Sequence, residues 1–536
     1  MKSCFHRFGM RFAARGRHAV VIASAMLATA LFAAVPAWAA GARYQPDPGF
    51  NHGRYFIDAF ASSQSNSYRA KKLVRLNNGD VIVAGIVPPL LGGNSGGLGL
   101  VHYDAAGVRL SWPDAGDFAL YQDWLVYNFD RFVPRVITDV KDIKVHGDRI
   151  FVLVDSETYS MGGTPPHTYF SGYASDVLVF STGGAFLGSA EMGGMSAGPS
   201  EPRNFHGGGI GVYSTGVFPE VVSLVFGGTE IDSGRYRPVF RRFTVQGDGS
   251  LTDQTGMVFP DANNLCANSN NGCEITGVAL GGRSNFTAPP RIYLGGSYSN
   301  LFDWKWSFAV MRVNSYGTPD TTFDGGLAYI SVFTVGQPTE DRGQGIAVVP
   351  GSNLQGTEDQ IYVAGNVRVN CGNGVAIAKF RADGLGDPTF NNSQRWLLFG
   401  HNYSSGNICF IPRTDNYSHA IAVDADGNIA VAGQRNIGLH FGGTGEITVD
   451  ATLAVVSPNG SLLSFDKYPY TDTAGGTRTR HSGLWGVVAS GNGTFTAAGD
   501  VRFLTPSNPE TGKMQYATIR FADDPPIFKD GFDGVQ

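Results

Sequence analysis

Two stretches and two histidines of this chain have residue types that could do chemistry, and in each case the surrounding sequence argues for a structural role. Residues 93–97 read Gly-Asn-Ser-Gly-Gly and match a hydrolase nucleophile elbow, but a strand pattern follows where that elbow needs a helix. Residues 424–428 begin like a calcium loop, yet Arg435 stands where the bidentate glutamate belongs. His419 and His481 each precede an apolar strand pattern, which indicates packing. We therefore predict no catalytic residues, no metal site and no cofactor.

Four cysteines follow the N-terminal segment, and an even number in an exported chain favours disulfide bonds. We predict one bond between Cys266 and Cys273, which flank a short Asn-rich loop, and another between Cys371 and Cys409. A zinc site is the alternative, but the cysteines form no Cys-x-x-Cys pair and no histidine stands at ligand spacing. The pattern therefore favours structural cross-links.

Aromatic residues are frequent in the longest loops between the apolar segments. Flat rings of this kind can stack on sugars or fill a pocket on a protein partner. The alternative is that the rings pack against the rim of the scaffold. The residues that we predict to bind a ligand are Tyr169, Tyr298, Trp304 and Tyr403.

The elements that must position these residues are copies of one short strand. Residues 361–365, Ile-Tyr-Val-Ala-Gly, recur with variation along the chain, and the closing glycines stand at 85, 228, 296, 365, 433 and 499. The last four intervals are 68, 69, 68 and 66 residues, and the first is about twice as long because residues 150–154 form a copy without the glycine. Such regular spacing indicates seven repeats of one supersecondary unit.

Each repeat contains four short apolar segments joined by turns, which in the fifth repeat are residues 345–349, 360–365, 375–380 and 394–399. A four-stranded meander cannot cover both of its faces alone, and repetition solves that problem. We predict an all-β fold over residues 40–524, a seven-bladed β-propeller of four-stranded antiparallel blades. An open β-solenoid is the alternative. The last repeat lacks a fourth strand, so we expect the N-terminal strand at residues 54–60 to close the last blade.

The repeats resemble the delta-60 repeats of secreted bacterial proteins. The shared pattern is an Asp-Gly turn, a strand ending in Val-Ala-Gly, a third strand ending in Arg-Phe or a close variant, and then Asp-x-x-Phe. It is clearest in residues 308–312 with 320–323, residues 377–380 with 387–390, and residues 421–433. The resemblance covers essentially all of the mature chain, strongly in repeats four to six and weakly in repeats two and three. It implies a β-propeller in an exported protein, and it implies no catalytic residue.

The two ends of the chain have their own signals. Five basic residues precede an apolar run at residues 19–34, and Ala37-Trp38-Ala39 then supplies the pattern that a signal peptidase cleaves, which predicts a signal peptide at residues 1–39. No later stretch approaches the roughly 20 apolar residues of a membrane span. We therefore expect a secreted, periplasmic or cell-surface protein. Residues 525–536 are predicted to be a flexible tail that resembles a sorting motif.

Removal of the signal peptide leaves about ten more acidic than basic residues, which argues against nucleic acid as a partner. We predict an exported, monomeric, non-enzymatic β-propeller scaffold that binds a glycan or another protein on its long-loop face. The alternative is a secreted hydrolase or lyase with its site at the central channel. Converging polar groups in that channel would favour the enzyme, and packed strands alone would favour the scaffold.

Overall fold

The computed structural model divides the chain into two compact units, residues 1–43 and 44–536, and every described residue belongs to the second unit. The predicted signal peptide and C-terminal tail lie outside the described residues. The structure describes residues 44–50, 56–58, 69–87, 97–115, 120–121, 124–127, 135–162, 167–193, 204–215, 220–232, 234–261, 266, 271–285, 287–300, 305–332, 341–352, 357–369, 372–400, 413–438, 448–468, 481–491, 493–502 and 514–523.

The described residues form β-strands almost throughout, with one short 3-10 turn at Asp324–Gly326. Within each of the first six repeats the first strand pairs with the second, the second with the third and the third with a fourth, all antiparallel, and the seventh repeat has the first three of these strands. This is the predicted meander.

The strands occupy equivalent places in successive repeats. The first strands are β3 (Arg69–Arg75), β9 (Arg135–His146), β13 (Asn204–Ser214), β17 (Asn271–Arg283), β21 (Asp341–Val349), β25 (Arg413–Val423) and β29 (His481–Gly491). The second strands are β4 (Val81–Val87), β10 (Arg149–Gly162), β14 (Val222–Asp232), β18 (Pro290–Asn300), β22 (Gln360–Val369), β26 (Ile429–Gly438) and β30 (Thr494–Arg502). The third strands are β5 (Gly97–Tyr103), β11 (His167–Ser181), β15 (Arg235–Val245), β19 (Lys305–Val313), β23 (Gly372–Phe380), β27 (Thr448–Val456) and β31 (Met514–Asp523).

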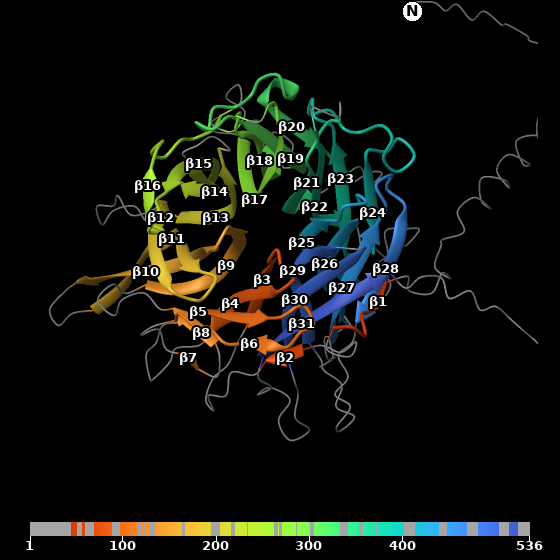
Figure 1. Cartoon of the computed structure of the whole chain (residues 1–536). Helices are drawn as coiled ribbons and strands as arrows, with labels where there is room; N and C mark the ends of the chain where they lie inside the picture. The colour runs from red at the N-terminus through yellow and green to blue at the C-terminus, as the bar shows by residue number, and fades with distance from the viewer. Residues whose placement is uncertain are drawn as a thin grey trace, which may run out of the picture. The chain divides into compact units, whose positions relative to one another are not determined.

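The outer strands are shorter and less regular. They are β6 (Arg109–Leu110) and β8 (Trp124–Tyr127) beside β5, with β7 (Leu120–Tyr121) beside β8, and then β12 (Phe186–Gly193), β16 (Leu251–Asp253), β20 (Leu327–Ile330), β24 (Trp396–Phe399) and β28 (Leu462–Tyr468). Each first strand contacts the first strand of the next repeat, and β29 also contacts β3 (Figure 1).

The N-terminal strands belong to the last repeat rather than to the first. Strands β1 (Tyr44–Pro46) and β2 (Phe56–Asp58) both pair with β31 (Figure 1). In β2, Phe56 lies opposite Thr518. Arg520 Nε also donates a hydrogen bond of 2.6 Å to the Asp47 carboxylate. The predicted pairing of the N-terminal segment with the last repeat is therefore present.

The hydrophobic core lies between neighbouring sheets. One cluster, for example, joins Phe308 and Val310 of β19 to Ile361 and Val363 of β22 in the next repeat. A sheet between two others is buried on both faces, so its inner strands need apolar side chains at successive positions. This explains why the second strands form nearly continuous apolar runs in the sequence.

Several smaller predictions can be checked directly. Cys266 and Cys273 form the predicted disulfide, whereas Cys371 and Cys409 lie outside the described residues, as do residues 93–96. Residues 424–428 form the predicted turn, because Asp424 Oδ1 accepts hydrogen bonds from the backbone N–H groups of Asp426 and Asn428 at 2.9 and 2.8 Å. No helix among the described residues is long and apolar enough to cross a membrane.

Candidate functional site

Every first strand contains a β-bulge at the same place. At each bulge one residue has no partner in the pairing with the second strand, so the register shifts by one. Bulges re-aim side chains and are frequent next to active sites. The unpaired residues, which we call the bulge residues, are Lys71, Lys141, Gly208, Thr276, Gln344, His419 and Trp485.

The repeated glycine of the second strand accompanies this bulge. At Gly433 a Cβ atom would lie 1.9 Å from the carbonyl oxygen of Tyr417, two residues before the bulge residue of that repeat. The glycines at 85, 296, 365 and 499 meet the equivalent carbonyl oxygen at 1.7 to 2.1 Å. Only a residue without Cβ fits there. In the second repeat Val154 replaces the glycine, and β9 has an additional register shift beside Asp155.

A hydrogen bond from one repeat to the next satisfies the backbone beside the bulge. The residue before the bulge donates its N–H to a side-chain oxygen from the second strand of the preceding repeat, since the bulge disturbs the local pairing. These pairs are Gly207 with Asp155 (2.8 Å), Ile275 with Thr229 (2.8 Å), Gly343 with Ser297 (2.9 Å) and Ser418 with Asn366 (2.7 Å). The first repeat has Ile86 at this position, and there the Val140 N–H donates to Asp139 instead.

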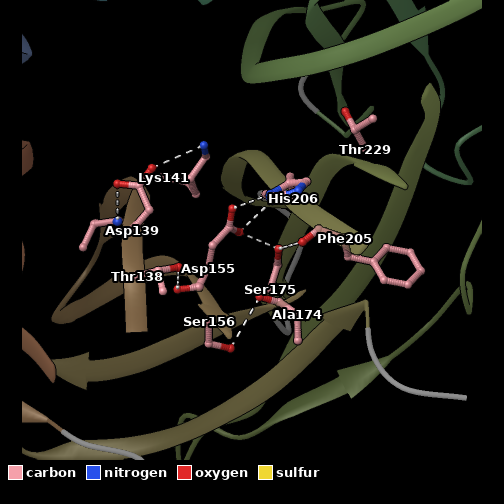
Figure 2. A network of polar contacts seen from close by, with 12 residues as sticks. Thr138, Asp139, Lys141, Asp155, Ser156, Ala174, Ser175, Phe205, His206 and Thr229 are labelled. Carbon is pink, nitrogen blue, oxygen red and sulfur yellow. Dashed lines mark hydrogen bonds and ion pairs between the residues drawn. The ribbon is translucent and has the colours of Figure 1, made fainter. Parts of the chain in front are cut away.

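Figure 2 shows one of these junctions, where Asp155 joins a serine and a histidine. Ser175 Oγ donates to Asp155 Oδ1 at 2.6 Å, and His206 Nδ1 lies 3.4 Å from Asp155 Oδ2. In a catalytic triad the histidine stands between serine and aspartate so that it can accept the serine proton. Here the aspartate stands in the middle, and its Oδ1 also accepts the Gly207 N–H. This network therefore joins two repeats and does not activate Ser175.

The bulge side chains line a cavity at the centre of the first strands. A cavity of about 120 Å³ is bounded by six of the bulge residues and by Lys72, Asp139 and Val140. A second cavity of about 210 Å³ adjoins it and is lined by residues of all the first strands, including Asp142, Lys144 and Gly208. We call the two together the channel cavity. Polar and charged side chains from distant parts of the sequence thus converge on one space.

Asp139 is the carboxylate at the centre of this group. Lys71 Nζ lies 3.4 Å from its carboxylate. Lys141 Nζ lies 3.5 Å from it, a contact that Figure 2 shows. Burial would raise the pKa of Asp139, but Lys141, Lys71 and Lys72 outweigh burial and lower it below the usual value. Asp139 is therefore ionised at neutral pH.

Lys72 is the most unusual cation of the cavity. Burial, helped by the charges of Lys141 and Lys71, lowers the pKa of Lys72 to about 8, although Asp142 and Asp139 act in the opposite direction. Its ammonium group donates to the carbonyl oxygen of His419 at 3.4 Å. Among the described residues no carboxylate lies within 4 Å of this ammonium group.

His419 and Trp485 form a stacked pair, with ring centroids 3.9 Å apart. Lys71 Nζ lies 4.2 Å from the centroid of the Trp485 ring, and Trp485 Nε1 donates to Asp500. Burial, followed by the charges of Lys72 and Lys71, lowers the pKa of His419 to about 3, so the imidazole is neutral near pH 7. Among the described residues, the buried Nε2 of His419 has no hydrogen-bond partner.

A row of rings leads along the β10–β11 hairpin to the Asp155 network. Phe170, which is 47% exposed, lies 5.1 Å from Tyr173, and Tyr173 lies 5.2 Å from His206 between ring centroids. Tyr159 packs on Phe170 from the other strand of the hairpin. The row therefore ends at the carboxylate whose charge acts on Lys141.

The residues predicted to bind a ligand are only partly described. Tyr298 is 7% exposed and packs against Tyr329 in the core of its sheet. Tyr169 lies in β11, and nothing is described of its side chain, while Trp304 and Tyr403 lie outside the described residues. The set therefore stays a prediction. Sequence reasoning missed Lys71, Lys72, Asp139 and Lys141. The usable signal was a polar residue just before the apolar part of the first strand, which five of the seven repeats have.

Two sequence comparisons bear on the family. The model of a domain of unknown function with a β-propeller fold, DUF5122, matches residues 291–323. These residues lie in β18, β19 and the turns that follow, so the match supports a β-propeller family over a short stretch. No curated protein sequence matches this chain.

Similar solved structures include Trypanosoma rangeli sialidase in complex with sialic acid, with 9% identity, a TM-score of 0.33 and coverage of 91% of this chain and 59% of that chain. Bombyx mori GH32 beta-fructofuranosidase has 10% identity, a TM-score of 0.28 and coverage of 89% and 92%. The alpha-L-arabinofuranosidase of Fusarium graminearum has 12% identity, a TM-score of 0.33 and coverage of 71% and 93%. This chain spans 54% to 60% of the sialidase chains that it matches.

The channel corrects the predicted function. The prediction of a non-enzymatic binding scaffold was wrong, because the channel is not filled by packed strands alone. The channel also contains converging polar side chains, which is the observation that favours the enzyme over the scaffold. At identities of 9% to 12%, no substrate, residue role or mechanism is transferred from those proteins to this chain.

Proposed function

We propose that the protein is a glycan-active enzyme, a hydrolase or lyase, with its site in the channel cavity. The observation that supports this proposal most directly is the convergence of Asp139, three lysines, Thr276, Gln344 and His419 on one space. Bulges repeated at equivalent positions deliver these side chains, although the residue types differ from repeat to repeat. A channel that served only as a packed scaffold would need no such set of charged groups.

Asp139 is the group that we assign to proton transfer or nucleophilic attack. Its carboxylate is ionised at neutral pH because the neighbouring lysines lower its pKa, as a general base or nucleophile requires. Lys71 and Lys141 flank it and can stabilise negative charge on a leaving oxygen. Thr276 and Gln344 carry hydrogen-bonding groups suited to sugar hydroxyls.

A glycan is the substrate class that suits the surroundings of the cavity. The rings of Phe170 and Tyr173 on β11 and of His206 on β13 follow one another at centroid distances of 5.1 and 5.2 Å, and aromatic rings can stack on sugar rings. This row ends beside Asp155, whose charge acts on Lys141, and Lys141 lines the cavity. A chain of sugar units could therefore run from the hairpin to the cavity.

The framework that we propose is a closed, seven-bladed β-propeller of delta-60-like repeats, exported with the aid of residues 1–39. The contact between β29 and β3 and the pairing of β1 and β2 with β31 support closure. Closure would cover the sheet edges that otherwise promote aggregation. Electron microscopy of the purified protein, with a count of the blades, tests this arrangement.

The activity test uses the purified chain without residues 1–39 and a panel of polysaccharides and aryl glycosides. Release of reducing ends reports hydrolysis, and ultraviolet absorbance of an unsaturated product reports elimination. We expect D139N to lower kcat by at least about a hundredfold, as for loss of a proton-transfer group. The matched control is D383N, which changes an exposed aspartate in a turn after β23 and should keep full activity. Equal activity of the two variants would refute the assignment.

A further inference from the structure

We propose that the channel cavity binds an oxyanionic group of its ligand, a carboxylate or a sulfate, through Lys72 and His419. This inference deepens the proposed function, because it assumes that the same cavity receives the substrate and adds that the substrate is an acidic glycan. It rests on three observations: the balance of charge in the cavity, the Lys72 ammonium group without a carboxylate within 4 Å among the described residues, and the His419 Nε2 atom that has no partner among the described residues.

The charges that line the cavity do not balance. Four lysines and two aspartates line it, which leaves an excess of two positive charges. Asp142 is bound by Lys144 at 2.6 Å, and Asp139 is shared between Lys71 and Lys141. The unmatched charge therefore belongs to Lys72 and to one of the two lysines on Asp139.

Two further carboxylates near the cavity have their own partners. Glu274 forms an ion pair of 2.8 Å with Arg342. Asp155 accepts hydrogen bonds from Ser175 and from the Gly207 backbone, and it contacts His206. Neither carboxylate lies within 4 Å of Lys72, although Asp155 does contribute to the field at Lys141. The excess charge at Lys72 is thus left for a ligand.

Lys72 supplies N–H groups that have no carboxylate partner, and His419 supplies a buried ring nitrogen without a partner among the described residues. The Lys72 ammonium group lies 3.4 Å from the His419 carbonyl oxygen, which accepts one of its three N–H groups. The other N–H groups can bind an oxyanion. His419 Nε2 is buried without a partner among the described residues, and in the tautomer that carries hydrogen on Nε2 it would donate as well. A buried donor or charge without a partner is costly, so an anion bound here would relieve both penalties.

The lowered pKa values of both groups agree with this geometry. Burial is the largest cause of the lowered pKa of His419, and the charges of Lys72 and Lys71 follow. Lys141 and Lys71 likewise contribute to the depression at Lys72. Both groups therefore sense a positive field that a bound anion would reduce.

The test is a titration that needs no turnover. Isothermal titration calorimetry on the purified chain without residues 1–39 would compare glucuronate, glucose 6-sulfate and glucose. We expect at least one charged sugar to bind at least about tenfold more tightly than glucose, as for one charge-assisted hydrogen bond. The preferred charged sugar identifies the source of the oxyanion as a uronic acid or a sulfate ester. Equal binding of all three sugars would overturn the proposal.

A matched pair of lysine variants assigns the site. K72M should lose at least about tenfold in affinity for the preferred charged sugar, whereas K144M should lose less than about twofold because Lys144 is already paired with Asp142 in the same channel. H419L should also weaken binding. Equal losses in K72M and K144M would overturn the assignment. If K72M does not fold, the comparison of charged and neutral sugars on the unmodified chain still tests whether the cavity binds an oxyanion.

The two proposals fail in different ways. Binding of a charged sugar without cleavage of any acidic polysaccharide would remove the proposed activity and keep the anion site. Cleavage of neutral glycans with no preference for acidic ones would keep the activity and remove the anion site.

Discussion

The carbonyl oxygen of Tyr417 occupies the space that a Cβ atom on Gly433 would need, at 1.9 Å. The contact is a consequence of the bulge at His419, which brings the first strand close to the second strand just before the unpaired residue. The same relationship recurs in most repeats. The repeated glycine and the bulge are therefore two parts of one structural device.

This contact predicts that G433A will be strongly destabilising. The added methyl group overlaps backbone rather than a flexible side chain, so relief requires movement of a strand, and we expect a cost at the upper end of the usual range for overpacking, about 3 kcal/mol. The control is G247A, because a Cβ at Gly247 meets nothing within 4 Å. Urea unfolding of both variants gives the comparison. A G433A protein as stable as G247A would contradict the coupling of glycine and bulge.

The hydrogen bonds between repeats predict a second stability effect. Ser297 is 1% exposed, and its Oγ accepts the N–H of Gly343 in the next repeat at 2.9 Å. S297A leaves this buried N–H without its partner, which should lower the free energy of unfolding by about 1 to 3 kcal/mol. Thermal unfolding measures the loss. S461A, at an exposed position, should change stability by less than about 0.5 kcal/mol. Similar losses of stability in S297A and S461A would show that the hydrogen bond from Gly343 to Ser297 does not stabilise the fold.

The repeated four-stranded units could be predicted from the sequence, but the residues of the channel cavity could not. The glycines from 85 to 499 revealed the repeat because the bulge excludes any other residue there, so the physical constraint is visible in the residue type. The bulge residues carry no such constraint, and Lys71, Gly208 and Trp485 have nothing in common except their position.

Their convergence depends on the three-dimensional arrangement of the first strands. Asp139 meets Lys71 from the preceding repeat, and His419 stacks on Trp485 from the following one. Such contacts cannot be seen in one sequence, because no short-range pattern links residues almost one repeat apart. The sequence indicated that His419 is a packing residue before a first strand, and its location in the channel was not predicted.

The pKa of Lys72 predicts an unusual dependence of stability on pH. The pKa falls from 10.5 to about 8 on folding, chiefly through burial. Below pH 8 the folded protein keeps a buried charge, and a shift of this size corresponds to a penalty of about 3 kcal/mol. Between pH 8 and 10.5 the unfolded chain binds more protons than the folded chain at this site, so this contribution to stability rises with pH.

K72M should therefore be more stable than the unmodified protein at pH 7, and the difference should shrink as the pH rises above 8. The lowered pKa of Lys72 already reflects the charges around its ammonium group, which are those of Asp142, Asp139, Lys141 and Lys71. Denaturant unfolding from pH 6.5 to 9.5 in a buffer without polyvalent anions measures the difference. K144M serves as the control, because its lysine is ion-paired and should show no such trend. If K72M were less stable than the unmodified protein at pH 7, the buried charge of Lys72 would not destabilise the fold.

The last prediction concerns the acidic limb of the activity profile. If Asp139 must be ionised, activity should stay constant from neutral pH down to about pH 4, because its pKa lies below 3.8. Removal of a neighbouring cation in K71M should raise that pKa, since an opposite charge within about 4 to 6 Å lowers a carboxyl pKa by about 1 to 3 units. The acidic limb of kcat/KM should then move upward by about one unit, whatever activity K71M retains at pH 7 after losing a charge that stabilises the leaving oxygen. A limb that stays in place, or activity that increases on acidification, would show that Asp139 is not the base.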